Sequence, residues 1–448
     1  MRIIKATIIF LLAFVAFGRL APQDPFNPQH VTRIALALSL SEGRVDIDQL
    51  AANTVDKSFF EGHYYADKPP GVSMLAVPVV LATRAVLDSM ALGSDPSDPA
   101  ALETYIRVVA ITVIALPAAL AVMLLYVLAL RLGASGAAAS FAACALAVGT
   151  PYFGWSSTLF AHALSGAILL GAMAVSILNR PAGWVAPVAG MLLGFLLVVD
   201  ITAAPAGALV GLFILLRSER RVRSFVGLAI GGLAGLAPLL VYNQLAFASP
   251  FRMGYSQVQG FAGMQQGFFG IGLPQPTVLG ELLFGHFRGL LPLAPVLLLV
   301  PIGLWAMFRF LPTRAVAVVI TGVVLSFLLI NAGYYYWDGG SSTGPRHLVA
   351  ALPLACLALA FAWPPGWPAK LVALLFLLVS LLISMVVASV DPMSPPWFEQ
   401  PFFGYLLPGF FQGGWVAATL ATAVIWVGFA IVGLWPDRSG AERHQLAA

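Results

Sequence analysis

LVALLFLLVSLLISMVVASV, residues 371–390, contains no charged side chain over its 20 residues. A helix of this length rises about 30 Å, which matches the thickness of the hydrocarbon core of a bilayer. A helix is expected because it satisfies its own backbone hydrogen bonds where water is absent. The stretch therefore predicts a membrane-spanning helix.

Similar apolar runs recur along the whole chain. Of its 448 residues, 60% are hydrophobic and 9% are charged, whereas a soluble domain carries about 25% charged residues. Windows of about 19 residues predict spans at 3–20, 104–130, 134–150, 158–179, 183–199, 201–217, 225–246, 290–308, 315–335, 347–363, 371–390 and 411–435. We therefore expect an all-α polytopic membrane protein that forms one domain over 1–448, without a separate soluble domain. The net charge of +4 gives no support for a nucleic-acid partner.

One further apolar stretch, 71–90, decides on which side of the membrane every later loop lies. If it does not cross, both termini and the short loops, including RSERRVR (217–223), fall on one side. That side carries 13 Lys and Arg but only 3 acids, and basic residues concentrate in cytoplasmic loops. We therefore predict that 71–90 is juxtamembrane and that both termini are cytoplasmic, at a bacterial inner membrane. Residues 21–103 would form a large first periplasmic loop with interfacial helices.

The first 20 residues admit two interpretations. Arg2 and Lys5, followed by an apolar run, are typical of a secretory signal peptide. Because no A-x-A cleavage site follows the run, a retained first helix is preferred.

The first outer loop, residues 21–103, holds the densest group of polar side chains. Between 44 and 68 it contains acids, lysines, His63 and two adjacent tyrosines, and Pro69-Pro70-Gly71 follow directly. Prolines at this point would hold the preceding pair, Asp67 and Lys68, at the entrance of a helix. A merely solvated interfacial loop, which is the alternative, would need only some of these residues. The loop is therefore the first candidate for a functional site.

Residues 62–78, GHYYADKPPGVSMLAVP, resemble the Tyr-x-x-Lys-Pro-Pro signature of the GT-C class of polyprenyl-phosphate-sugar glycosyltransferases. Within that class the pattern is most similar to lipid A aminoarabinose transferases and protein O-mannosyltransferases. TPYFGWSSTLFAHA (150–163), RGLLPLAP (288–295) and YYWDGGSSTGPRHLVAALP (335–353) follow in matching order. The resemblance implies a GT-C-like bundle of about 12 transmembrane helices plus juxtamembrane helices in the first outer loop.

The same resemblance implies a reaction. A sugar would move from a polyprenyl-phosphate donor to a glycan, lipid or protein acceptor at the periplasmic face, by a metal-independent, inverting displacement. Lys68 matches the lysine that contacts the donor phosphate in the class. Arg346 and Arg288 are further candidates, since arginine can hold a phosphate through two hydrogen bonds.

The general base is where this chain departs from the class. An Asp-Glu pair is expected about 15 residues before Gly43, but residues 27–30 read Asn-Pro-Gln-His. A carboxylate or a neutral imidazole can take the proton of an acceptor hydroxyl. Asp56 and Asp67 are the leading candidates, followed by His30, with the alternative that Asp67 serves as the ion-pair partner of Lys68.

Other outer-loop residues are expected to contact the substrates. These are His63, Tyr65, His162 and Asp338. Asp46-Ile47-Asp48 has the spacing of a cation site, but we predict no metal, because the class generally needs none. We expect no cofactor beyond the lipid-linked donor.

Two other classes of function are alternatives. A transporter or flippase tends to place ionisable groups near the middle of its spanning helices, and a scaffold protein would not need the clustered charges of the first loop. The charges here gather in the outer loops, which favours chemistry at the membrane surface.

Overall fold

The computed structural model describes residues 2–20, 22, 24–179, 183–413 and 415–435. The helices are α1 (Arg2–Gly18), α2 (Pro28–Ser41), α3 (Gly71–Ser89), α4 (Pro99–Val109), α5 (Leu116–Arg131), α6 (Gly136–Val148), α7 (Tyr152–Trp155), α8 (His162–Leu178), α9 (Val185–Val199), α10 (Ala204–Arg217), α11 (Arg221–Phe247), α12 (Pro276–Phe284), α13 (Leu290–Leu293), α14 (Val300–Arg309), α15 (Leu311–Gly333), α16 (Leu352–Ala362), α17 (Trp367–Val390), α18 (Leu407–Gln412) and α19 (Trp415–Leu434). Two short strands, β1 (Lys57–Phe60) and β2 (His63–Ala66), complete the elements used below.

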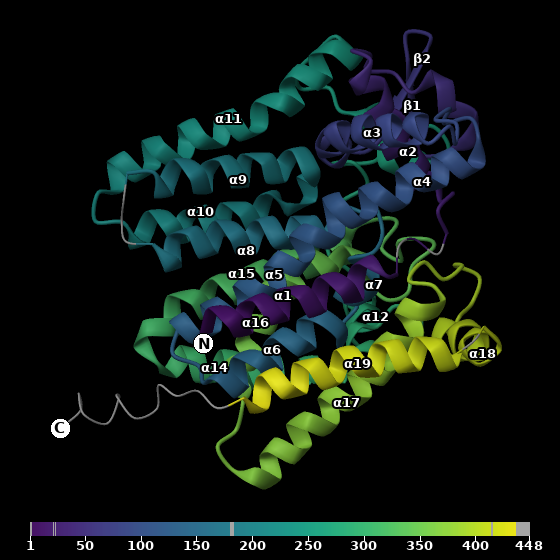
Figure 1. The fold of residues 1–448 in the computed structure, drawn as a ribbon. Coiled ribbons are helices and arrows are strands. Elements are labelled where there is room, and N and C mark those ends of the chain that lie inside the picture. Colours follow the sequence, from purple (N-terminus) through teal and green to yellow (C-terminus); the bar gives the residue numbers. More distant parts are fainter. Residues whose placement is uncertain (1, 21, 23, 180–182, 414, 436–448) are drawn as a thin grey trace.

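Most long helices run side by side in one bundle (Figure 1). Five described helical stretches, among them Pro99–Arg131 and α17, are long and apolar enough to cross a membrane, and shorter apolar helices lie beside them. Most predicted spans coincide with a helix or with a helix extended by a short 3-10 or π segment. The span 290–308 instead comprises α13, a 3-10 segment and α14, and the span 411–435 begins at the end of α18 and continues into α19. The chain is therefore an all-α multi-pass membrane protein, while the number of twelve crossings stays a prediction.

The start of α1 and the end of α19 meet at one end of the bundle. Nζ of Lys5, in α1, donates a hydrogen bond to the carbonyl oxygen of Trp435, which follows α19 (2.6 Å). The basic turn between α10 and α11 lies at the same end, and the β1–β2 hairpin lies at the opposite end (Figure 1). This arrangement agrees with an even number of crossings.

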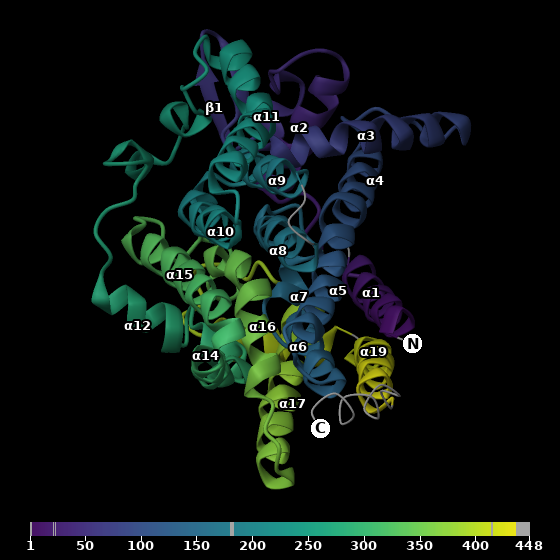
Figure 2. The ribbon, with the colours of Figure 1, turned by 90° about the vertical axis from the view of Figure 1, so that its left-hand side faces the viewer.

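α3, the helix at 71–90, lies across the bundle. Figure 2 shows many bundle helices nearly end-on but α3 along its length, packed beside α2. A Cβ atom at Gly71 would lie 2.6 Å from the carbonyl oxygen of Val198 at the end of α9. Glycine therefore lets α3 begin directly against α9. Its orientation supports the juxtamembrane prediction, although its length and composition alone would also suit a crossing.

The first outer loop adds a small sheet to the helical fold. β1 and β2 form an antiparallel hairpin in which Ser58 pairs with Tyr65. Isolated bridges join Ser58 to Val258 and Ile271 to Tyr334. These bridges fix the long loop after α11 to both the hairpin and the end of α15. Three segments that are distant in the sequence therefore lie side by side.

Candidate active site

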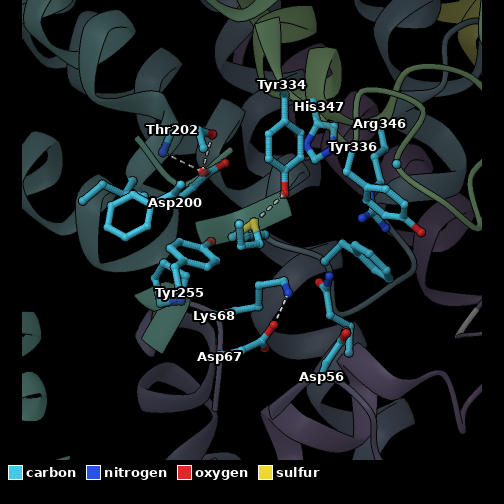
Figure 3. Close-up of a pocket in the computed structure, with 18 of the residues that line it drawn as sticks. Asp56, Asp67, Lys68, Asp200, Thr202, Tyr255, Tyr334, Tyr336, Arg346 and His347 are labelled. Atoms are coloured by element: carbon cyan, nitrogen blue, oxygen red, sulfur yellow. Dashed lines mark hydrogen bonds and ion pairs between the residues drawn. The ribbon is translucent and has the colours of Figure 1, made fainter. Parts of the chain in front are cut away.

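A cavity of about 290 Å³ lies at the end of the bundle that carries the hairpin. Its walls come from the first outer loop, the start of α8, the α9–α10 connection, the loop after α11, and residues 327–347. Figure 3 shows Lys68, Asp56 and Arg346 on different walls of this cavity. Five of the predicted site residues line this cavity: Asp56, Asp67, Lys68, His162 and Arg346.

Asp67 and Lys68 connect β2 to α3. The Lys68 ammonium donates a hydrogen bond to the Asp67 carboxylate, whose side chain is 1% exposed. Burial by itself lowers the pKa of Lys68, but the charges of Asp67 and Asp56 outweigh it and raise the pKa above its ordinary value. Lys68 therefore keeps its positive charge at neutral pH.

The loop after α11 closes one side of Lys68. A Cβ atom at Gly254 would lie 2.8 Å from the carbonyl oxygen of Ala66, so only glycine permits the loop to approach the end of β2 this closely. Nζ of Lys68 then lies 6.0 Å from the ring centroids of both Tyr255 and Phe261. At this distance aromatic faces attract a cation, and they leave its hydrogens available to a ligand.

Arg346 provides the second cation of the cavity. Its guanidinium carbon lies 5.0 Å from the ring centroid of Phe160, and its buried Nε forms no hydrogen bond with a described residue. Gly339, with φ of +72°, leaves the necessary room, because a Cβ atom there would lie 2.9 Å from this Nε. Arg346 can therefore offer its N–H groups to an anion in the cavity.

Asp56 has a fixed backbone and an available carboxylate. Its carbonyl oxygen accepts from the Thr32 hydroxyl (2.8 Å) and its N–H donates to the Thr54 hydroxyl (3.0 Å). Its carboxylate makes no hydrogen bond with another described residue, and its side chain is partly exposed at the cavity. It can therefore accept a proton from a bound molecule.

Asp200 forms another wall of the cavity. One of its carboxylate oxygens accepts from the Thr202 hydroxyl (2.6 Å) and the other lies 3.8 Å from Nδ1 of His162. The ring of His347 lies 5.2 Å from that of His162. This side of the cavity is rich in hydrogen-bonding groups, which suits a polar part of a substrate.

Five predicted site residues do not line the cavity. His30 is fully buried beside Phe160, and burial lowers its pKa to about 4. His63 is exposed on the hairpin and pairs with Asp48 (2.6 Å). Tyr65 packs on Phe247.

The other two belong to one contact. Arg288 is fully buried and donates to the carbonyl oxygens of Asp338 (2.7 Å) and Gly340 (2.6 Å). This arginine therefore fastens the loop after α15, and the Asp338 backbone is its partner.

Several cavity residues were not anticipated. They are Arg33, Asp200, Tyr255, Tyr334 and His347. A lone carboxylate between two closely spaced apolar runs is uncommon in membrane helices, so the sequence could have indicated Asp200 as a functional residue. Arg33 lies inside the apolar pattern of α2, and the tyrosines lie in distant loops. No local sequence pattern therefore indicates that these residues line the cavity.

The Asp46-Ile47-Asp48 motif is divided between two partners. Arg44 donates to Asp46 (2.7 Å), whereas Asp48 accepts from His63 and from the N–H of Tyr64. Among the residues that the structure describes, no group of three or more His, Cys, Asp or Glu is arranged to hold a metal ion.

Comparison with known proteins shows a likeness of fold. No protein-family model and no curated protein sequence matches the chain. The fold is similar to the crystal structure of ArnT from Cupriavidus metallidurans bound to undecaprenyl phosphate, with a TM-score of 0.52 and 14% sequence identity. The match covers 96% of this chain and 76% of that one. The chain therefore has the fold of ArnT, which confirms at the level of structure the resemblance of its first outer loop to GT-C polyprenyl-phosphate-sugar glycosyltransferases.

Proposed function

We propose that this protein is a membrane glycosyltransferase that moves a sugar from a polyprenyl-phosphate donor to an acceptor hydroxyl at the outer face of the membrane. The observation that carries the proposal is one cavity that is lined by two cations, Lys68 and Arg346, and by the carboxylate of Asp56. It occurs on the fold of ArnT, whose crystal structure contains undecaprenyl phosphate. A lipid, a polysaccharide or a protein can supply the acceptor hydroxyl.

The two cations suit the leaving group. Breaking the bond between the anomeric carbon and the phosphate oxygen leaves that electron pair on the polyprenyl phosphate. Lys68, held in its charged form, and Arg346, with an unused buried N–H, would stabilise the added negative charge. Hydrogen bonds between charged partners are about twice as strong as neutral ones.

Asp56 is the general base in this proposal. The acceptor oxygen forms the new bond to the anomeric carbon while its proton passes to the Asp56 carboxylate, and a single displacement inverts the configuration. Asp67 is less suited because its carboxylate already pairs with Lys68. His30 is less suited because it is buried outside the cavity.

The orientation follows the distribution of charge. We propose that the cavity faces the periplasm of a bacterial inner membrane, with 21–103 as the first periplasmic loop and both termini in the cytoplasm. The basic α10–α11 turn at the end opposite the hairpin supports this. A transporter is disfavoured because the charged residues of the spanning helices lie near the helix ends, as Arg314 in α15 and Lys370 in α17 do.

A transfer assay tests the proposal. Purified protein would receive labelled polyprenyl-phosphate sugars together with lipid, polysaccharide and protein acceptor fractions. The wild type and a matched variant, Lys57→Ala, should transfer label, because Lys57 lies over Tyr64 on the hairpin and does not line the cavity. Lys68→Ala should not. Transfer by Lys68→Ala at the wild-type rate, or no transfer by the wild type to any fraction, would contradict it.

A further inference from the structure

A second pocket lies at the other end of the bundle. It has a volume of about 290 Å³ and is formed by the end of α8, the start of α9 and the turn between α10 and α11. Figure 1 shows this turn at the end opposite the hairpin. The pocket is therefore separate from the cavity that holds Lys68.

Its lining is strongly basic. Arg217, Arg220 and Arg223 line it together with a single acid, Glu219. Among the described residues, none of these arginines forms an ion pair within 4.0 Å, and Arg131, at the end of α5, adds a further positive charge that acts on Arg217. Three arginines beside one carboxylate leave the pocket with a net positive charge, which favours an anionic ligand.

The local backbone and hydroxyls shape the pocket for such a ligand. A Cβ atom at Gly183 would lie 2.8 Å from a terminal nitrogen of Arg223, so glycine allows this arginine to reach across the pocket. The hydroxyls of Ser218 and Ser224 lie 2.7 Å apart on the wall. Arginine and serine together are suitable donors for phosphate oxygens.

An apolar surface continues from the pocket along α11. Val222, Val226, Ile230 and Leu233 are all exposed, and their spacing of three or four residues places them on one face of the helix. Trp184, beside the pocket, is about half exposed, as is common where a membrane meets water. The face begins at Val222, which lines an open hollow together with Arg220 and Arg223 of the pocket. It therefore offers a path for acyl chains beside the basic pocket.

We infer that this pocket binds the phosphate headgroup of an anionic phospholipid, with the acyl chains along α11. Only a lipid satisfies both features, since a soluble anion would use the arginines but not the apolar face. The site goes beyond the proposed glycosyl transfer, because none of its residues lines the cavity at the other end.

Native mass spectrometry can test the inference on the full-length protein in detergent. The probes are phosphatidylglycerol, phosphatidylcholine and inorganic phosphate. The wild type should retain phosphatidylglycerol in preference to phosphatidylcholine. Arg220→Gln with Arg223→Gln should weaken phosphatidylglycerol binding by about 25-fold, because each basic side chain near an anionic lipid contributes about fivefold.

The matched control removes two arginines from the same end of the bundle. Arg309→Gln with Arg314→Gln should leave the binding unchanged, because neither arginine lines the pocket. Unchanged binding in the pocket variant, or equal losses in both variants, would overturn the inference. Stabilisation by inorganic phosphate alone, with no effect of phosphatidylglycerol, would overturn it as well.

Discussion

Asp67 and Lys68, neighbours in the sequence, form an ion pair in the wall of the cavity, and the Asp67 side chain is almost fully buried. The ammonium is the more exposed partner, at 23% of its side chain, and it points into the cavity (Figure 3). The buried carboxylate thus fixes a cation whose remaining hydrogens face the cavity. Because a buried charge that loses its partner is strongly destabilising, the pair also links stability to binding.

Two variants can separate the effect of this ion pair on stability from its effect on binding. Lys68→Gln should lower both thermal stability and the affinity for polyprenyl phosphate, because it removes the ligand's cation and leaves Asp67 unpaired. Adding Asp67→Asn should recover most of the stability but not the affinity, which should stay about 10- to 100-fold weaker. Recovery of both properties would mean that Lys68 has only a structural role.

Asp56→Asn tests the general base. The substitution keeps the size of the side chain but removes the proton acceptor, so the rate of transfer should fall by about 10²- to 10⁴-fold. Donor binding should be unchanged or tighter, because a negative charge near the phosphate is lost. Single-turnover rates and equilibrium binding measure the two effects. Asp46→Asn is the control, since Asp46 pairs with Arg44 outside the cavity; a wild-type rate for Asp56→Asn would assign the proton to another group.

Arg288→Lys distinguishes a structural from a binding role. The lysine cannot donate to both Asp338 and Gly340 as the guanidinium does. The variant should lose about 1.5–3 kcal/mol of stability, while the folded protein keeps its affinity for polyprenyl phosphate. Thermal melting and lipid binding should be measured together. Unchanged melting with lost binding would show instead that Arg288 is a phosphate ligand.

His30 makes stability depend on pH. Its pKa falls from 6.5 to about 4 in the folded protein because of burial, so the unfolded state binds the proton more readily. Above about pH 6.5 His30 is neutral in both states and costs no stability. As the pH falls toward 4, the unfolded state takes up the proton first, and the free energy of unfolding decreases by about 3 kcal/mol. Melting curves at pH 7 and pH 4 should show a smaller acid loss in His30→Gln than in the wild type. Equal losses would exclude His30 as the source.

Close packing of α9 on α11 depends on glycine. A Cβ atom at Gly231 would lie 2.0 Å from the carbonyl oxygen of Pro187, whereas one at Gly171 in α8 would meet nothing within 4 Å. Gly231→Ala should therefore lower stability by about 1–3 kcal/mol, and Gly171→Ala should not. Detergent melting of the two variants compares them directly; equal melting would mean that the helices separate at little cost.

The sequence predicts the helical bundle well because lipid imposes a simple rule. Apolar runs of about 20 residues must form helices, and each predicted span is mostly helical in the part of the chain that the structure describes. The first outer loop was also informative, because its signature places Lys68 directly. Its β-hairpin was not predicted, since four-residue strands within a charged loop carry little periodic signal.

The rest of the site depends on contacts between distant segments. Tyr255 reaches Lys68 because Ser58 pairs with Val258, and Tyr334 reaches the cavity because it pairs with Ile271. No local pattern encodes such bridges. Arg288 shows a different limit of the sequence. An arginine just before a helix suggests a phosphate ligand, but in the structure its guanidinium donates hydrogen bonds to backbone carbonyl oxygens.

A structure of the protein with a bound polyprenyl phosphate is the most direct test of the central claim. The account predicts that the phosphate lies in the cavity, with its oxygens about 2.8 Å from Nζ of Lys68 and from a guanidinium nitrogen of Arg346. It also predicts that the Asp56 carboxylate lies on the side of the phosphate to which the sugar is attached in the donor. A lipid phosphate bound elsewhere, with the cavity free of it, would contradict the account.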